Sequence, residues 1–280
     1  MQDYRMETFL TLCETMNHHA AAERLCLTQP AVTQHIRRLE ERYGCRLFTY
    51  DGRRLRLTRQ GEMLREFAVL EKQREVRLQE RLHGGLSLRV GATKTIGEYV
   101  IAPQVAACLA RPGCSLTLEV DNTAHILGRI DEGKLDFALI EGSFDRARYA
   151  WRLFRREPFV GVCGAGHPFA GRRICPEMLR SEQLFLREEG SGTRRILEEV
   201  LDAAGLGVNI FGGVATLGSF TLMTGLMAAS AGITFAYEAV AVENPSLATF
   251  QVEGWETTRE FNCVWLPGSG GEEAAEAFGV

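Results

Sequence analysis

Three polar side chains near the N-terminus have the types and the spacing needed to contact DNA bases. Gln29, Thr33 and Arg37 recur at every fourth position, so they share one face if this segment is an α-helix. Amide, hydroxyl and guanidinium groups form hydrogen bonds with base edges in the major groove, and short side chains near a helix N-terminus can enter it. The row therefore predicts a recognition helix.

The neighbouring residues predict a helix that holds this row outward. Thr28 can cap the first turn, whose N–H groups lack partners within the helix, and Pro30 suits a place in that turn. Val32, Ile36 and Leu39 recur at helical spacing and form a narrow apolar stripe on another face. We therefore expect the helix to pack through the stripe and to expose the polar row.

Arginines concentrate around this segment. Residues 24–59 hold nine arginines against three acidic residues, a balance of +6, although the whole chain has a net charge of −4. The dipeptide Asp51-Gly52 predicts a β-hairpin, and Arg53, Arg54 and Arg56 on it would contact phosphates as a wing. A basic patch on an otherwise acidic chain indicates a polyanion-binding module. On charge alone, a solvated helix face explains it equally well.

A resemblance to LysR-type transcriptional regulators is carried by METFLTLCETMNHHAAAERLCLTQPAVTQHIRRLEERYGCRLF and by the closing LTRQGE. It implies a winged helix-turn-helix, a linker helix that dimerises and a periplasmic-binding-protein-like sensor domain, in a homodimer or, more often, a homotetramer. Two departures are Tyr50, where the family often has a phosphate-binding arginine, and Asn17-His18-His19, which replaces Ser-Phe-Thr. The predicted DNA contacts are Thr28, Gln29, Pro30, Thr33, Gln34, Arg37, Arg38, Arg53, Arg54 and Arg56.

The rest of the chain changes in pattern twice. Residues 59–84 are rich in helix formers and predict a linker and dimerisation helix after a DNA-binding domain at 1–58; a solvated spacer is the alternative. Residues 85–280 then alternate strand and helix, with residues 96–110 expected to form one helix, and this alternation predicts parallel sheets with helices on their faces. We expect an α/β effector-binding domain of two lobes, lobe I at 85–160 and 249–280 and lobe II at 161–248.

Hydroxyl and glycine residues lie at three expected helix starts in this domain, where N–H groups can bind an anion. The residues are Thr93, Lys94 and Thr95, then Ser191, Gly192 and Thr193, then Thr216 and Ser219. They resemble the effector-contacting segments of LysR-type sensors, which favours a small anion such as an organic or amino acid; each hydroxyl could instead be a helix cap. Thr224 stands where the family frequently has a lysine, and Glu141 could suit an amine or be solvated.

Other classes of function lack their motifs. The sequence has no GxSxG elbow, HExxH, P-loop or Rossmann fingerprint, so we expect no catalytic site, metal or cofactor. The eight cysteines are scattered without a CxxC pair; we expect reduced thiols, with a thiol-redox regulator of the same architecture as the alternative. A two-lobed solute-binding protein or enzyme is less favoured. The expected partners are an inverted-repeat duplex, a small effector and RNA polymerase, in the cytoplasm and without a membrane.

Overall fold

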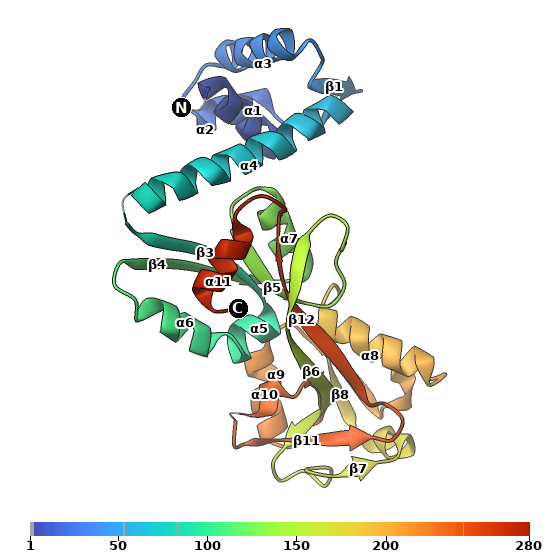
Figure 1. Ribbon diagram of the computed structural model, residues 1–280. Helices are drawn as coiled ribbons and strands as arrows, with labels where there is room; N and C mark the ends of the chain where they lie inside the picture. Colours follow the sequence, from blue (N-terminus) through green and yellow to red (C-terminus); the bar gives the residue numbers. More distant parts are fainter. Residues whose placement is uncertain (1–2, 53, 83, 243) are drawn as a thin grey trace. The chain divides into compact units, whose positions relative to one another are not determined.

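The computed structural model describes residues 3–52, 54–82, 84–242 and 244–280. The chain divides into two compact units (Figure 1). The first holds Met1–Gly85 with the short segments Asp131–Lys134 and Gly268–Gly270, and the second holds the remainder.

The first unit is a small helical domain with a hairpin and one long helix. Its elements are α1 Tyr4–Thr15, α2 His18–Arg24, α3 Gln29–Tyr43, β1 Phe48–Asp51, β2 Arg54–Leu57 and α4 Arg59–Leu82. The predicted order of three helices and a hairpin is confirmed. Its core is built around Phe9, Leu12, Val32 and Leu39, each no more than 1% exposed, and the rings of Phe9 and Phe48 meet edge to face.

The motif LTRQGE fixes the start of α4 through the hydroxyl of Thr58 and through Gly61, which has no side chain. Thr58 Oγ1 accepts from the Gly61 N–H at 3.0 Å and donates to the Arg46 carbonyl at 2.6 Å. A Cβ on Gly61 would lie 2.2 Å from the Leu47 carbonyl oxygen, so α4 packs here against backbone and only glycine fits. The first turn of α4 is thus fixed to the chain that precedes the hairpin.

The second unit is built on a curled sheet of eight strands. Its path is β4–β3–β5–β12–β6–β11–β7, with β10 paired to β6, and β8 and β9 form a separate parallel pair. The strands are β3 Leu86–Thr93, β4 Cys114–Asp121, β5 Phe137–Glu141, β6 Ala150–Gly164, β7 Arg173–Ile174, β8 Gln183–Arg187, β9 Gly213–Leu217, β10 Thr234–Tyr237, β11 Leu247–Val252 and β12 Thr257–Trp265. Because β3 pairs in parallel with β4 and β5, the predicted βαβαβ arrangement and the α/β class are confirmed.

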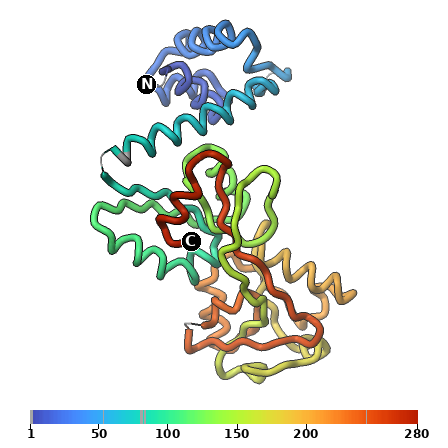
Figure 2. Tube along the Cα trace, in the orientation of Figure 1, coloured from blue at the N-terminus to red at the C-terminus, as the bar shows by residue number. Residues whose placement is uncertain are grey.

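The long strands β6 and β12 run side by side and join two lobes (Figure 2). The first lobe carries β3, β4 and β5, with α5 Lys94–Tyr99, α6 Ala102–Leu109, α7 Thr123–Asp131 and α11 Gly271–Phe278. The second carries β7 to β11, with α8 Gly192–Ala203, α9 Phe220–Ala228, α10 Ala239–Val242 and two 3₁₀ turns, Pro176–Ser181 and Val208–Ile210.

One element prediction was wrong. The segment 96–110 was expected to be one helix, but it forms the two helices α5 and α6. Pro103 occupies the first turn of α6, where its missing N–H is tolerated, whereas within a continuous helix it would remove a hydrogen bond and clash with the preceding turn.

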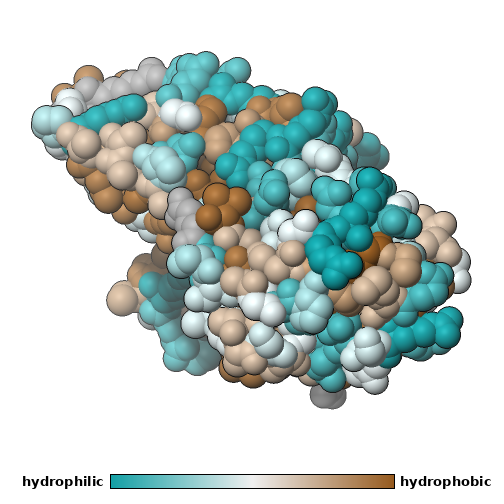
Figure 3. Space-filling model, turned by 90° about the horizontal axis from the view of Figure 1, so that it is seen from below, coloured by the Kyte–Doolittle hydropathy of each residue, from teal (hydrophilic) through white to brown (hydrophobic). Residues whose placement is uncertain are grey.

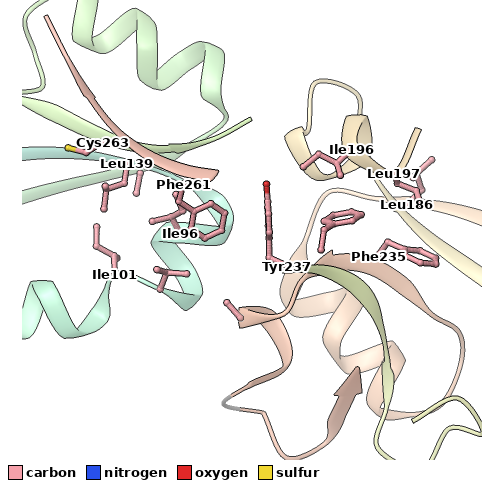
Figure 4. Packing of buried hydrophobic residues seen from close by; sticks show 14 of the residues in the cluster. Ile96, Ile101, Leu139, Leu186, Ile196, Leu197, Phe235, Tyr237, Phe261 and Cys263 are labelled. Carbon is pink, nitrogen blue, oxygen red and sulfur yellow. The ribbon is translucent and has the colours of Figure 1, made fainter. Parts of the chain in front are cut away.

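Tyr237 connects the cores of the two lobes. Its ring lies between Phe261 and Ile96 on one side and Phe235 on the other (Figure 4). The ring centroids of Tyr237 and Phe261 are 4.7 Å apart, and Tyr237 is fully buried. The lobes therefore share apolar packing at the place where β6 and β12 pass from one lobe to the other.

The surface seen in Figure 3 is a mosaic of hydrophilic and hydrophobic residues. Among the described residues, no helix combines the length and the apolar composition needed to cross a membrane.

Candidate functional site

The start of α3 has the geometry that its sequence predicts. Thr28 Oγ1 accepts from the Ala31 N–H at 3.4 Å, and Pro30 lies in the first turn. Val32 and Leu39 are fully buried and Ile36 is 5% exposed. The apolar stripe thus holds α3 against the domain core.

The predicted DNA contacts on α3 are all exposed. They are Thr28, Gln29, Pro30, Thr33, Gln34, Arg37 and Arg38. Thr33 donates its hydroxyl to the Gln29 carbonyl at 3.1 Å, and Arg37 pairs with Glu41 at 3.0 Å. Both contacts are local and solvent-exposed, so the side chains can exchange them for contacts to a ligand.

Sequence reasoning missed the contact that fixes α3 on its neighbour. His35 Nδ1 lies 2.9 Å from Thr8 Oγ1, and the His35 ring meets the Tyr4 ring edge to face at 4.9 Å. Burial lowers the pKa of His35, and the charges of Arg38 and Arg5 add to this effect. A neutral imidazole therefore joins α3 to α1 beside the exposed row.

The hairpin β1–β2 presents the wing residues. Gly52 adopts a φ of +61° in the turn, which suits the predicted Asp-Gly hairpin. Arg54 and Arg56 are exposed, and Arg56 pairs with Asp51 at 2.9 Å. Arg53, the third predicted wing residue, lies outside the described residues.

The second unit brings three of the predicted effector residues together at the end of β5. Glu141 Oε1 accepts from the Thr95 hydroxyl at 3.2 Å, and the Glu141 N–H donates to Thr93 Oγ1 at 3.3 Å. All three residues are at most 5% exposed. Burial raises the pKa of Glu141 to about 7, although the Thr95 hydrogen bond and the charge of Arg187 lower it. The other carboxylate oxygen, Oε2, is buried and has no hydrogen-bond partner in the described structure.

The N-terminus of α8 faces this carboxylate from the second lobe. A Cβ on Gly192 would lie 3.7 Å from Glu141 Cγ, so the two chains approach closely. Ser191 and Thr193 share a hydrogen bond of 2.8 Å, and Ser191 makes no side-chain cap to the helix. The first N–H groups of α8 are therefore not capped by the residue in the usual capping position.

Lys94 does not join the Glu141 cluster but bridges the lobes elsewhere. Its Nζ lies 3.1 Å from Glu188 Oε1, while Arg187 forms two hydrogen bonds with the same carboxylate at 2.8 and 2.9 Å. Although burial opposes it, these bonds, with those to the backbone and Lys94, lower the pKa of Glu188 to about 2. The guanidinium of Arg187 also lies 4.1 Å above the Phe220 ring. The ion cluster ties α5 to the end of β8.

A cleft of about 830 Å³ opens beside Glu141 and Gly192. It is lined by parts of α7, β6, β12 and α8 and by the loop after β5: Thr123, Ala124, Leu127, Glu141, Gly142, Ser143, Phe144, Arg146, Arg156, Gly190, Gly192, Arg195, Ile196, Glu199, Thr258, Arg259, Glu260 and Asn262. Of the predicted effector residues, only Glu141 and Gly192 are in this lining. The predicted residues outside this lining are Thr93, Lys94, Thr95, Ser191 and Thr193, together with Thr216, which is exposed on β9, and Ser219, which caps α9 by accepting from the Leu222 N–H.

The arginines of the cleft were not predicted as effector residues. Arg146 and Arg156 pair with Glu260 at 3.0 and 3.4 Å, and Arg259 pairs with Glu199 at 2.8 Å. Arg195 is exposed, and its guanidinium has no ion-pair or hydrogen-bond partner in the part of the chain that the structure describes. Arg195 lies two positions after the predicted segment Ser191–Thr193. This proximity was the signal in the sequence that could have identified it as an effector residue.

Comparisons with known proteins assign both units to the same family. Residues 4–62 match the model of the bacterial regulatory helix-turn-helix protein, lysR family, and residues 83–279 match the LysR substrate binding domain. The regulator CysL of Bacillus subtilis is 30% identical over 72% of this chain and 70% of its own length. A RuBisCO operon transcriptional regulator of Allochromatium vinosum is 29% identical over 98% of this chain and 93% of its own. A cysteine-to-aspartate variant of full-length OxyR from Pseudomonas aeruginosa has the same fold, with a TM-score of 0.70 and 22% identity over 99% of this chain and 93% of that one.

Proposed function

This chain belongs to the LysR family of DNA-binding transcription regulators, and from that premise we propose that α3 reads an inverted-repeat operator while a small anion binds in the cleft of the second unit. The regulator acts in the cytoplasm as a homodimer or homotetramer, so that two recognition helices meet two half-sites of the operator. RNA polymerase is the partner whose access to the promoter it changes.

The exposed row on α3 carries the DNA-binding part of the proposal. Gln29, Thr33 and Arg37 are exposed on a helix whose opposite stripe is buried. A recognition helix needs this division, because the buried stripe fixes the helix while the free face enters the major groove. Gln29 can form a bidentate contact with adenine, and Arg37 can contact guanine or phosphate.

The wing supports binding without reading sequence. Arg54 and Arg56 are exposed on the hairpin, where guanidinium groups can neutralise backbone phosphates. We extend this role to Arg53 on the sequence alone.

Arg195 carries the effector part of the proposal. Its guanidinium is free of carboxylates, whereas Arg146, Arg156 and Arg259 in the same cleft are paired. The adjacent N-terminus of α8 adds N–H groups that favour an anion. An anion bound to both would therefore lie against α8 and face the first-lobe residues that line the same cleft.

Titration with inorganic phosphate tests the effector site in the full chain. Phosphate added at constant ionic strength should raise the melting temperature of the wild type, whereas Arg195→Ala should remove most of this increase. Arg172→Ala is the matched control, because Arg172 is an exposed arginine of the second lobe outside the cleft. Equal increases in all three proteins would contradict the proposed site.

An effector changes transcription only if it binds one arrangement of the lobes more tightly than another. The ion pair of Lys94 with Glu188, at 3.1 Å, joins the two lobes. This ion pair would be kept in one arrangement of the lobes and lost in another. The anion could then bind one of these two arrangements more tightly than the other.

A further inference from the structure

Two thiols of the second unit are in direct contact. The sulfur atoms of Cys108 and Cys114 lie 2.7 Å apart, and all eight cysteines of the chain are free thiols. The described residues contain no cluster of three His, Cys, Asp or Glu side chains placed to hold a metal ion. We propose that Cys108 and Cys114 form a reversible redox dithiol, which a peroxide oxidises to an intrachain disulfide.

The connection between α6 and β4 positions this pair. Cys108 lies in the last turn of α6, and Cys114 is the first residue of β4. The Arg111 N–H donates to the Cys108 carbonyl at 3.1 Å, and the Cys114 N–H donates to the Arg111 carbonyl at 3.2 Å. Gly113, with a φ of +73°, completes the reversal. Two successive turns therefore return the chain so that the two side chains meet.

Both ends of the connection are packed against the core, so the positions of the two cysteines are fixed by the fold. Cys108 is fully buried in the main core of the second unit. Cys114 packs against the same core, and Leu86 lies beside it in the β3–β4 register. A disulfide needs its sulfurs at about 2.05 Å, so they must approach by roughly 0.7 Å. Small side-chain rotations supply such a movement.

The two thiols differ in their access to an oxidant. Burial raises the pKa of Cys108 to about 11, and the hydrogen bond with Cys114 adds to this shift. Cys108 therefore keeps its proton near neutral pH, within hydrogen-bond distance of Cys114. Cys114 is only partly buried, so it is the sulfur that an oxidant reaches.

The oxidation has two balanced steps. The Cys114 sulfur attacks one oxygen of the peroxide, the O–O bond breaks, and Cys114 becomes a sulfenic acid while water or an alcohol leaves. The Cys108 sulfur then attacks Cys114 Sγ, the S–O bond breaks, and water leaves with the proton that Cys108 gives up. The two thiols lose two electrons in total, and the peroxide gains them. This redox site does not depend on the proposed effector cleft.

Peptide mapping of the full chain tests the proposal. Trypsin does not cut the Arg111-Pro112 bond, so one peptide, Thr95–Arg129, carries Cys108 and Cys114 and no other cysteine. After treatment with hydrogen peroxide and blocking of free thiols, this peptide should be unblocked and lighter than its dithiol form by about 2 Da. Dithiothreitol should restore both thiols.

Variants distinguish a dithiol from a reactive single cysteine. In Cys108→Ser, Cys114 should stop at the sulfenic acid and become labelled by dimedone. Cys175→Ser, which removes another partly buried thiol, should keep the disulfide. Two blocked thiols in the wild-type peptide under conditions that oxidise the exposed Cys26 would overturn the proposal. A disulfide from Cys114 to any other cysteine would overturn it as well.

Discussion

Burial of one carboxylate makes the stability of the second unit depend on pH. Glu141 is 5% exposed, and desolvation raises its pKa from 4.5 to about 7. The folded chain therefore binds this proton more tightly than the unfolded chain does. The resulting stability is complete below pH 4.5 and is lost as the pH rises through 7.

Glu141→Gln should remove this dependence because an amide does not titrate in this range. Between pH 4.5 and 8 we expect the wild type to lose up to roughly 3 kcal/mol of unfolding free energy relative to the variant. Urea denaturation at the two pH values measures the difference. Glu199→Gln is the control, since its side chain is 50% exposed at the same cleft. Parallel pH profiles of wild type and Glu141→Gln would show that the carboxyl is not buried as described.

At the residue scale, the sequence predicts local contacts and misses long-range ones. The Thr28 cap and the buried Val32 and Ile36 follow from positions within one helix. The paired arginines of the cleft could not be found in the same way, because Arg146, Arg156 and Arg259 come from separate segments that meet only in the folded unit. Glu141 was named as a candidate, but its burial depends on strands and helices far away in sequence.

At the scale of elements, Gly61 shows why one helical position needs glycine. Alanine is normally preferred over glycine in a helix by about 1 kcal/mol. At Gly61, however, an added Cβ would lie 2.2 Å from the Leu47 carbonyl oxygen and 2.8 Å from Leu57 Cδ2. The close packing of α4 on the hairpin reverses the usual preference.

Gly61→Ala should therefore destabilise the first unit, by about 1–3 kcal/mol as for overpacked cores. Gly225→Ala in α9 is the matched control, because a Cβ there meets no atom within 4 Å, and it should stabilise by about 0.5–1 kcal/mol. Chemical denaturation of both variants measures the change in the free energy of unfolding, which should be negative for Gly61→Ala and positive for Gly225→Ala. A stabilising effect of Gly61→Ala would contradict the described packing of α4.

Elements with a strong local pattern were the ones that could be predicted. The hairpin at Asp51-Gly52 and the helix α3 have turn and capping residues in the expected places. The break between α5 and α6 was missed because the apolar pattern continues across Pro103. Strands β9 and β11 were not predicted as strands; the partly buried alternation of β9 is a weak signal without its partner β8.

For the whole molecule, the uneven distribution of charge predicts how DNA binding depends on salt. The arginines of 24–59 give that segment a balance of +6 in a chain of net charge −4. Each phosphate that a protein neutralises contributes about 0.9 to the slope of log affinity against log salt concentration. Binding that uses the wing should therefore weaken steeply with salt.

Arg54→Ala should reduce this slope by about 1 and weaken binding to all duplexes to a similar extent. Fluorescence anisotropy at several salt concentrations, with a selected operator and a random duplex, measures both effects. Arg172→Ala, in the second unit, serves as the control and should leave the slope unchanged. If Arg54→Ala kept the wild-type slope, the wing would have no phosphate contact at this position.

The class of the fold could be predicted because strand and helix alternate regularly after residue 85, and parallel pairing follows from that alternation. The lining of the cleft could not, since it depends on how β6 and β12 carry the chain between lobes. Local patterns thus give the elements and their class, whereas the chemistry of the cleft arises from residues that are distant in sequence.

The most direct measurement concerns the exposed row of α3. The wild type is first used to select duplexes from a random DNA library. The affinities of the wild type and of Gln29→Ala for the site selected by the wild type, and for random DNA, are then compared. We expect Gln29→Ala to reduce the preference for the selected site by about 10- to 100-fold while leaving its affinity for random DNA unchanged. An unaltered preference would contradict the assignment of this face to base recognition.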